Sequence, residues 1–259
     1  MSTNQNTEFT FLKHLEILRW HLVRSIIAIL FGTIIAFFNK SFLFDKVIFA
    51  CKENSFPTYV FLCKLSEKLC IQDMPFILMN VEMSGQFMMH ILVSFAAGLI
   101  LAFPYILIEI WKFISPAMYS AERYNTLVFF FSSLFLFFLG LFFGYFIIVP
   151  FSINFLSSYN ISFAIENKIH FISFIKTITK IVLTTAFLFQ LPVIVYFLTK
   201  FGIVTPSFLK NYRRHAFVII LILASILTPP DVFSQILIGI PIFCLYELSI
   251  FISIITKTK

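Results

Sequence analysis

Six long apolar runs constrain this chain more than any other feature of its sequence. They cover approximately residues 20–38, 87–113, 125–151, 177–199, 215–228 and 235–255. A helix needs about 20 predominantly apolar residues to cross the hydrocarbon core of a bilayer, and it is the single-segment structure that satisfies its own backbone hydrogen bonds there. We therefore predict an all-α polytopic membrane protein with six transmembrane helices.

Composition agrees with lipid as the solvent of this chain. Only 12% of the residues are charged, 60% are hydrophobic and 38 of the 259 are Phe, whereas a soluble domain of this size carries roughly twice that charge. The polar start, MSTNQNTEFTF, lacks the features of a cleaved signal peptide. With no internal repeat or flexible linker, residues 1–259 are expected to form a single integral membrane domain.

The last two apolar runs are interrupted. The stretch "ILTPPDVFSQILIGIP" places two prolines and an aspartate between them, the run Ala216–Leu227 has only 12 residues, and the last run contains Pro241 and Glu247. We expect both helices to be shorter than a full span, so that either the bilayer thins beside them or water enters from one face. Proline within the apolar runs predicts bent helices and a cupped bundle, at Pro104, Pro150, Pro192 and Pro241.

The arginines predict the orientation. Six alternating spans place all five on one side, together with both termini: Arg19, Arg24, Arg123, Arg213 and Arg214. The positive-inside rule makes that side the cytoplasm, so the chain is predicted to be N-in and C-in. The formal net charge of +7 is then a topology signal and an attraction to anionic lipid, and no nucleic-acid partner is expected.

The first external loop, about residues 39–86, holds three of the four cysteines, Cys51, Cys63 and Cys70. Two of them could pair on an oxidising side of the membrane, although free thiols are the favoured interpretation and the connectivity is open. Their spacing matches no metal signature. We expect neither a metal nor a cofactor.

An amphipathic segment, about residues 8–24, precedes the first span. Its apolar stripe and its polar residues separate at helical spacing: Phe11, Leu15, Leu18 and Leu22 on one side, and Lys13, Glu16, Arg19 and Arg24 elsewhere. Such a segment is expected to lie along the cytoplasmic membrane surface before the chain turns into the bilayer. Glu16 serves either as a plain interfacial residue, paired with Arg19, or as part of a binding site.

Two other polar positions are site candidates. Glu122 begins the third helix after the connection "WKFISPAMYSAERYN", where an acidic residue is explained either by the helix dipole or by ligand binding. Gln190 lies within "AFLFQLPVIVYF", and an amide in hydrocarbon must find a partner or water. Glu109 and Glu247 are expected to reach water because they lie near the cytoplasmic ends of their spans. No catalytic spacing is present, so an enzyme is not expected.

These residues carry a resemblance to a known family. "FISPAMYSAERY", "FFLGLFFGYF", "FLFQLPVIVYF" and "ILTPPDVFSQILIGIPIFCLYELSIF", together with "HLEILR" near the start, resemble TatC, the multispanning receptor subunit of the twin-arginine protein translocase. The resemblance extends over nearly the whole chain. The first external loop is its poorest part, since "VEMSGQF" replaces the family's usual proline after serine.

The resemblance implies a function and partners. Proteins of this family bind signal peptides with two consecutive arginines and, with TatA-type and TatB-type single-span subunits, export folded proteins using the proton-motive force. It also implies a bacterial cytoplasmic (inner) membrane, or an organellar membrane of bacterial origin, and self-association. The fifth helix is similar to the surface on which a TatB-type subunit docks.

The resemblance also implies site residues. Glu122 matches the glutamate of the first cytoplasmic loop that receives the arginine pair. In the N-terminal motif, which contains Arg19, Ile17 occupies the family's glutamate position and Glu16 lies one residue earlier, a rotation of about 100 degrees on a helix. Gln190 matches a polar position of the concave interior. The residues themselves, apart from the resemblance, predict that Pro229 and Pro230 fix the turn before the sixth helix and that Asp231 caps it.

Two other classes of function remain open on residues alone. A proton-coupled small-molecule transporter would explain Gln190 and Glu109 within apolar runs, together with bent helices, although no matching halves are visible in the sequence. A structural membrane scaffold would need none of the acidic positions.

Overall fold

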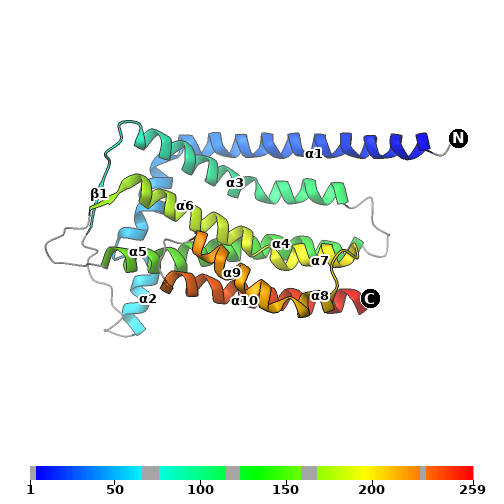
Figure 1. Cartoon of the computed structure of the whole chain (residues 1–259). Coiled ribbons are helices and arrows are strands. Elements are labelled where there is room, and N and C mark those ends of the chain that lie inside the picture. The colour runs from blue at the N-terminus through cyan, green and yellow to red at the C-terminus, as the bar shows by residue number, and fades with distance from the viewer. Residues whose placement is uncertain (1–3, 66–75, 115–122, 159–167, 228–231, 259) are drawn as a thin grey trace. The chain divides into compact units, whose positions relative to one another are not determined.

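The computed structural model of the chain describes residues 4–65, 76–114, 123–158, 168–227 and 232–258. Helices account for most of these residues (Figure 1). The α-helices are α1 (Asn4–Phe38), α2 (Pro57–Leu65), α3 (Gly85–Ile114), α4 (Arg123–Phe143), α5 (Val149–Ser158), α6 (Phe171–Leu188), α7 (Leu191–Lys200), α8 (Pro206–Asn211), α9 (Arg213–Leu227) and α10 (Val232–Thr258). Shorter elements are η1 (Phe42–Ile48), η2 (Phe49–Lys52), η6 (Gly144–Ile148) and the strands β1 (Ile77–Met79) and β2 (Lys168–His170).

Five helical stretches in the described part of the chain are long and apolar enough to cross a membrane. They are Leu15–Phe38, Gly85–Ile114, Phe130–Ser158, Phe171–Lys200 and Gln235–Thr256. The prediction of a polytopic helical membrane protein is confirmed. The predicted fifth span corresponds to α9, whose 15 residues reach only about 22 Å at 1.5 Å per residue.

The expectation that the last helix is also short is wrong. α10 has 27 residues and contains Pro241 in its interior. A proline removes one backbone donor and one helical hydrogen bond, but the apolar residues on both sides continue the helix through it. Of the last two predicted spans, α9 is therefore the one that is too short for the hydrocarbon core.

The expected turn between the N-terminal segment and the first span is also absent. α1 runs without interruption for 35 residues, from Asn4 to Phe38. No Pro or Gly stands between the polar start of the helix and the apolar run before Gly32, so nothing in the sequence ends the helix at the membrane surface.

The chain divides into two compact units. The first consists of Met1–Leu43 and His90–Leu134. Within it α1 and α3 lie side by side and run antiparallel (Figure 1). Gly32 faces Gly98 near the middle of the pair, and towards one end His90 Nε2 lies 3.0 Å from the carbonyl oxygen of Phe37 while the two rings stack. Small residues at the crossing let the two backbones approach closely.

The second unit consists of Phe44–Met89 and Phe135–Lys259. Pro150 lies at the start of α5, directly after the π-helical turn η6. Because proline has no N–H, the carbonyl of Phe146, four residues earlier, loses its helical donor, and the hydroxyl of Thr58 in α2 donates to it instead. Tyr59 donates to the carbonyl oxygen of Cys51 at 3.1 Å. α2 is thus attached to the helix at a place where proline leaves an acceptor free.

The GxxxG pair of the third span packs within this unit. A Cβ added at Gly140 would lie 2.8 Å from Cβ of Phe189, and one at Gly144 would lie 3.2 Å from Cβ of Thr185. The small residues at these two positions therefore let α6 approach the third span closely. The fourth span then breaks between α6 and α7, two residues before Pro192.

α10 packs against α7, α8 and α9 at the end of the chain. The hydroxyls of Thr199 and Ser253 lie 2.8 Å apart in a buried contact between α7 and α10. Arg213 donates from Nη2 to Oε2 of Glu247 at 2.7 Å, and the Glu247 side chain is 36% exposed. Glu247 therefore remains partly accessible, as expected.

Two short strands join the segment before α3 to the segment before α6. β1 and β2 pair in parallel, with Ile77 opposite Lys168 and Met79 opposite His170. α6 begins immediately after β2, and α3 begins six residues after β1 ends.

Among the described cysteines, Cys51 and Cys244 are free, and Cys63 takes part in a disulfide bond. The favoured interpretation of free thiols in the external loop is therefore wrong for Cys63.

Candidate functional site

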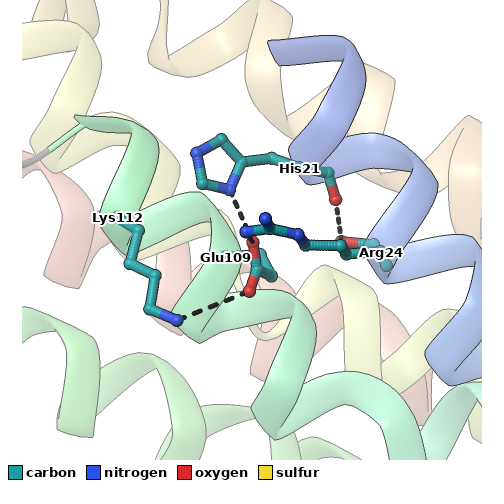
Figure 2. A network of polar contacts seen from close by, with 5 residues as sticks. His21, Arg24, Glu109 and Lys112 are labelled. Atoms are coloured by element: carbon teal, nitrogen blue, oxygen red, sulfur yellow. Dashed lines mark hydrogen bonds and ion pairs between the residues drawn. The ribbon is translucent and has the colours of Figure 1, made fainter. Parts of the chain in front are cut away.

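A buried carboxylate forms the centre of a polar cluster in the first unit (Figure 2). Glu109, on the last third of α3, is 1% exposed. An isolated carboxylate costs several kcal/mol to bury, so its presence in an apolar helix requires compensation by nearby charges and donors. The neighbouring helix α1 and the next turn of α3 supply them.

His21 makes the shortest contact of the cluster. Its Nδ1 lies 2.5 Å from Oε2 of Glu109. Because a carboxylate only accepts, the imidazole donates from Nδ1 in this arrangement. The edge of the ring faces Phe113 at 6.1 Å between centroids, and the hydroxyl of Ser25 donates to the His21 carbonyl at 2.9 Å. His21 therefore ties α1 to α3 through a specific donor and acceptor.

Arg24 and Lys112 complete the cluster at longer range. Arg24 Nη1 lies 3.9 Å from Oε2 of Glu109, and Lys112 Nζ lies 3.5 Å from Oε1. Their side chains are 54% and 55% exposed, whereas that of Glu109 is 2% exposed. One buried carboxylate thus faces two permanent cations and a histidine, and the cluster has an excess of positive charge.

Both tryptophans of the chain lie close in sequence to His21 and Glu109. Trp20 directly precedes His21, and Trp111 follows Glu109 by two residues. Trp111 lies 6.4 Å from Phe130 between ring centroids, and the guanidinium of Arg19 lies 5.9 Å from the centre of the Trp20 ring. Tryptophan concentrates at the boundary between hydrocarbon and headgroups, which places the cluster at that level of the membrane.

The structure places part of the site that the sequence predicts. Glu16 and Arg19 are exposed on α1, as is Ile17 at the position of the family's glutamate. Gln190 is 8% exposed at the break between α6 and α7. Its main-chain carbonyl oxygen accepts hydrogen bonds from the backbone nitrogens of Val193 and Ile194 at 3.0 Å each. The remaining predicted positions lie outside the described residues: Glu122, Pro229, Pro230 and Asp231.

Sequence reasoning missed the central cluster. The expectation that Glu109 reaches water is wrong, because His21 and the last turns of α3 enclose its carboxylate. A signal for the pairing existed: His21 and Glu109 each lie within two residues of a tryptophan, which indicates a common depth in the bilayer. In the part of the chain that the structure describes, no three His, Cys, Asp or Glu side chains gather in a way that could hold a metal ion.

Comparison with known proteins gives a consistent result. Residues 13–241 match the family model of the Sec-independent protein translocase protein (TatC). The chain is 39% identical to the Sec-independent protein translocase protein TatC of Blattabacterium sp. subsp. Periplaneta americana, and the match covers 99% of each chain. It is 33% identical to the protein of the same name from Aquifex aeolicus, over 95% of each chain.

Solved structures agree. A crystal structure of the twin arginine translocase receptor TatC is similar to this chain with a TM-score of 0.73 and 31% identity, over 94% of this chain and 99% of that one. A crystal structure of the receptor in DDM is similar with a TM-score of 0.75 and 32% identity, over 93% of this chain and 99% of that one.

Proposed function

Because this chain belongs to the TatC family of Sec-independent protein translocase proteins, we propose that it binds twin-arginine signal peptides at the cytoplasmic face of a bacterial inner membrane. It is a multi-pass core component of the twin-arginine translocase. We further propose that it acts with TatA-type and TatB-type single-span subunits, and with other copies of itself, to export folded proteins using the proton-motive force.

One observation supports the location of the binding site. The His21–Glu109 contact brings the N-terminal half of α1 and the C-terminal end of α3 together. Glu16 precedes His21 by five residues, about 7.5 Å along a helix. Glu122 follows Ile114, the end of α3, by eight residues, a stretch that spans at most about 28 Å. Both proposed carboxylates therefore belong to segments that leave the same end of one helix pair.

The chemistry suits an arginine pair. A guanidinium group presents planar N–H donors that match a carboxylate, and a site near the headgroups is screened less than bulk water. Each pairing could contribute on the order of 1 to 3 kcal/mol. Arg19 lies over Trp20, and among the described residues no ion pair joins it to Glu16, which favours an available Glu16.

Glu122 is proposed as the main acceptor, and Glu16 as the second. Because Ile17 stands where the family has a glutamate, the carboxylate at position 16 points in another direction around α1. Glu122 keeps the matching position in the loop. Gln190 is proposed to be an intramembrane position of the translocation route.

Photo-crosslinking of a twin-arginine signal peptide tests the assignment. Glu122→Ala and Glu122→Gln are expected to weaken crosslinking, and a twin-lysine peptide should crosslink poorly to the unmodified chain. Glu53→Gln is the matched control, because Glu53 is an exposed glutamate of the external loop. Undiminished crosslinking to both Glu122 variants would count against Glu122 as the acceptor.

α9 is proposed as the docking surface for the TatB-type subunit. Its exposed apolar residues include Phe217, Val218, Ile219, Ile222 and Ile226, and its 15 residues favour a thinned bilayer beside it. Disulfide crosslinking between cysteines at these positions and a single-span partner tests the surface. Crosslinks that form equally well on the lipid-exposed face of α1 would contradict it.

A further inference from the structure

The polar cluster of α1 and α3 has more hydrogen-bonding capacity than its carboxylate uses. A hydrogen bond from nitrogen to oxygen is about 2.7 to 3.2 Å long. Arg24 Nη1 and Lys112 Nζ lie 3.9 and 3.5 Å from Glu109, beyond that range. No hydrogen bond joins either cation to another residue in the described ranges of the chain. Their N–H groups therefore remain available to a further acceptor.

Charge points to an anionic acceptor. Glu109 contributes one negative charge, whereas Arg24 and Lys112 contribute two positive charges, and His21 takes the shortest contact with the carboxylate. Because Glu109 attracts both cations, it holds them on one side of the helix pair despite their mutual repulsion. Both side chains are about half exposed, at 54% and 55%, so a ligand can reach them from outside the protein.

Depth and surroundings point to a lipid. Trp20 and Trp111 mark the boundary between hydrocarbon and headgroups. Lys112 directly follows Trp111, and Arg24 lies about one helical turn after Trp20. Exposed apolar side chains flank the cations, with Val23 and Ile26 on α1 and Ile108 and Ile110 on α3. A ligand at this place needs a negatively charged head and an apolar body.

We propose that Arg24 and Lys112, gathered by Glu109, bind the phosphate of an anionic phospholipid at the end of the α1–α3 pair where α1 begins. The phosphate oxygens accept hydrogen bonds from the guanidinium and the ammonium, a pairing in which both partners are charged and which is correspondingly strong. The acyl chains lie along the exposed apolar faces of α1 and α3. The site does not depend on signal-peptide binding.

Tryptophan fluorescence tests the proposal directly, because Trp20 and Trp111 are the only tryptophans of the chain. The full chain is reconstituted in brominated phosphatidylcholine, which quenches tryptophan, and unbrominated phosphatidylglycerol is titrated in. If the site binds the anionic lipid, fluorescence recovers at a lower mole fraction than simple dilution predicts. Since a cation near the membrane surface contributes roughly a fivefold preference, we expect a preference of about fivefold or more over phosphatidylcholine. No preference in the unmodified chain overturns the proposal.

Variants separate the site from general charge. The double variant Arg24→Gln with Lys112→Gln should lose most of the preference. Arg24→Lys with Lys112→Arg keeps both cations and should retain it. The matched control is Lys64→Gln with Lys176→Gln, which removes two exposed cations elsewhere in the chain. A control that loses the preference as fully as the site variant would overturn the proposal.

Soluble anions distinguish the source of the phosphate. Glycerol phosphate and inorganic phosphate are added to the reconstituted chain at millimolar concentration. If the ligand is a lipid headgroup, neither changes the fluorescence titration. Displacement of phosphatidylglycerol by the soluble anions would assign the site to free phosphate and overturn the lipid assignment. Circular dichroism checks that each variant folds, and the measurement on the unmodified chain decides the proposal even where a variant does not.

Discussion

Gly32 of α1 and Gly98 of α3 meet backbone to backbone. A Cβ on Gly32 would lie 2.8 Å from the carbonyl oxygen of Gly98, and a Cβ on Gly98 would lie 2.4 Å from the backbone nitrogen of Thr33. Backbone atoms of a helix cannot move aside as the end of a side chain can. The two helices can therefore keep this separation only while both positions are glycine.

Substitution of Gly98 should destabilise the first unit. We expect Gly98→Ala to cost about 1 to 3 kcal/mol through overpacking, measured by unfolding in detergent. Gly239→Ala is the matched control, since its Cβ would first meet the end of the Leu221 side chain at 3.6 Å, and little change is expected. Equal losses for the two variants would contradict the importance of the close crossing.

The His21–Glu109 pair should show strong energetic coupling. His21→Phe removes the donor 2.5 Å from a buried carboxylate, and the loss of a hydrogen bond to a charged group costs about 1 to 3 kcal/mol. His21→Phe combined with Glu109→Leu removes donor and acceptor together, so the double variant should lose less stability than the sum of the single variants. A double-mutant cycle on the unfolding free energy measures the difference, and strict additivity would contradict the pairing.

The Cys51 thiol should react slowly. The side chain is 0% exposed, and burial raises the pKa of the thiol from the ordinary 9.0 to about 12. Because the thiolate is the reactive form, its fraction at pH 8 falls from about one in ten to about one in ten thousand. We expect maleimide to label Cys51 at least about a thousandfold more slowly in the folded chain than in the unfolded chain. Glu53→Cys, an exposed position nearby, should label rapidly in the folded state.

The same pKa shift predicts a loss of stability in alkali. Below pH 9 the Cys51 thiol is neutral in both states, and its contribution to stability is fully present. As the pH rises from 9 towards 12, the unfolded chain releases the proton first, and the free energy of unfolding falls. Burial also raises the pKa of Tyr59, so Tyr59 acts in the same direction. Cys51→Ala removes the thiol, so the free energy of unfolding of this variant should fall less between pH 8 and pH 10.5 than that of the unmodified chain.

Lys180 should protect the end of the short helix α9. Its Nζ donates to the carbonyl oxygen of Ile226, near the C-terminus of α9, where a cation stabilises a helix by about 0.3 to 1 kcal/mol. Lys180→Met should therefore speed hydrogen exchange in the last turn of α9 by roughly two- to fivefold. Lys176→Met, one turn earlier on α6 and also exposed, should leave the exchange unchanged.

Ile17→Glu tests the displaced carboxylate of the N-terminal motif. Ile17 is 43% exposed, so a glutamate there requires no burial of charge. If the family position is the better one for an arginine pair, crosslinking of the twin-arginine signal peptide should increase severalfold, and a Glu16→Gln change made in that variant should matter little. Unchanged crosslinking would indicate that Glu16 already occupies the effective position.

The spans were predictable because a helix that crosses hydrocarbon needs a continuous run of apolar residues, and such runs are visible in the sequence. The length of α10 was not, since Pro241 and Glu247 suggest interruption while packing against α7 and the Arg213 ion pair accommodate both. The uninterrupted course of α1 was missed because an amphipathic pattern does not specify whether a helix turns at the membrane surface.

The polar cluster of the first unit was less predictable, for a physical reason. Glu109 near a helix end satisfies the same sequence rules whether it reaches water or binds His21, 88 positions away in the chain. Only the antiparallel register of α1 and α3 decides between the two. The acidic positions Glu122 and Glu16 followed from a motif, and their roles stay predictions.

The parallel pairing of β1 with β2 also has a topological consequence. Two strands that share a ladder must lie in the same aqueous compartment, so the chain between Met79 and Lys168 crosses the bilayer an even number of times. The described residues of that interval contain two candidate spans, Gly85–Ile114 and Phe130–Ser158, and these therefore either both traverse the bilayer or both fail to. This parity rule holds for either orientation of the protein, and it owes nothing to the distribution of arginines.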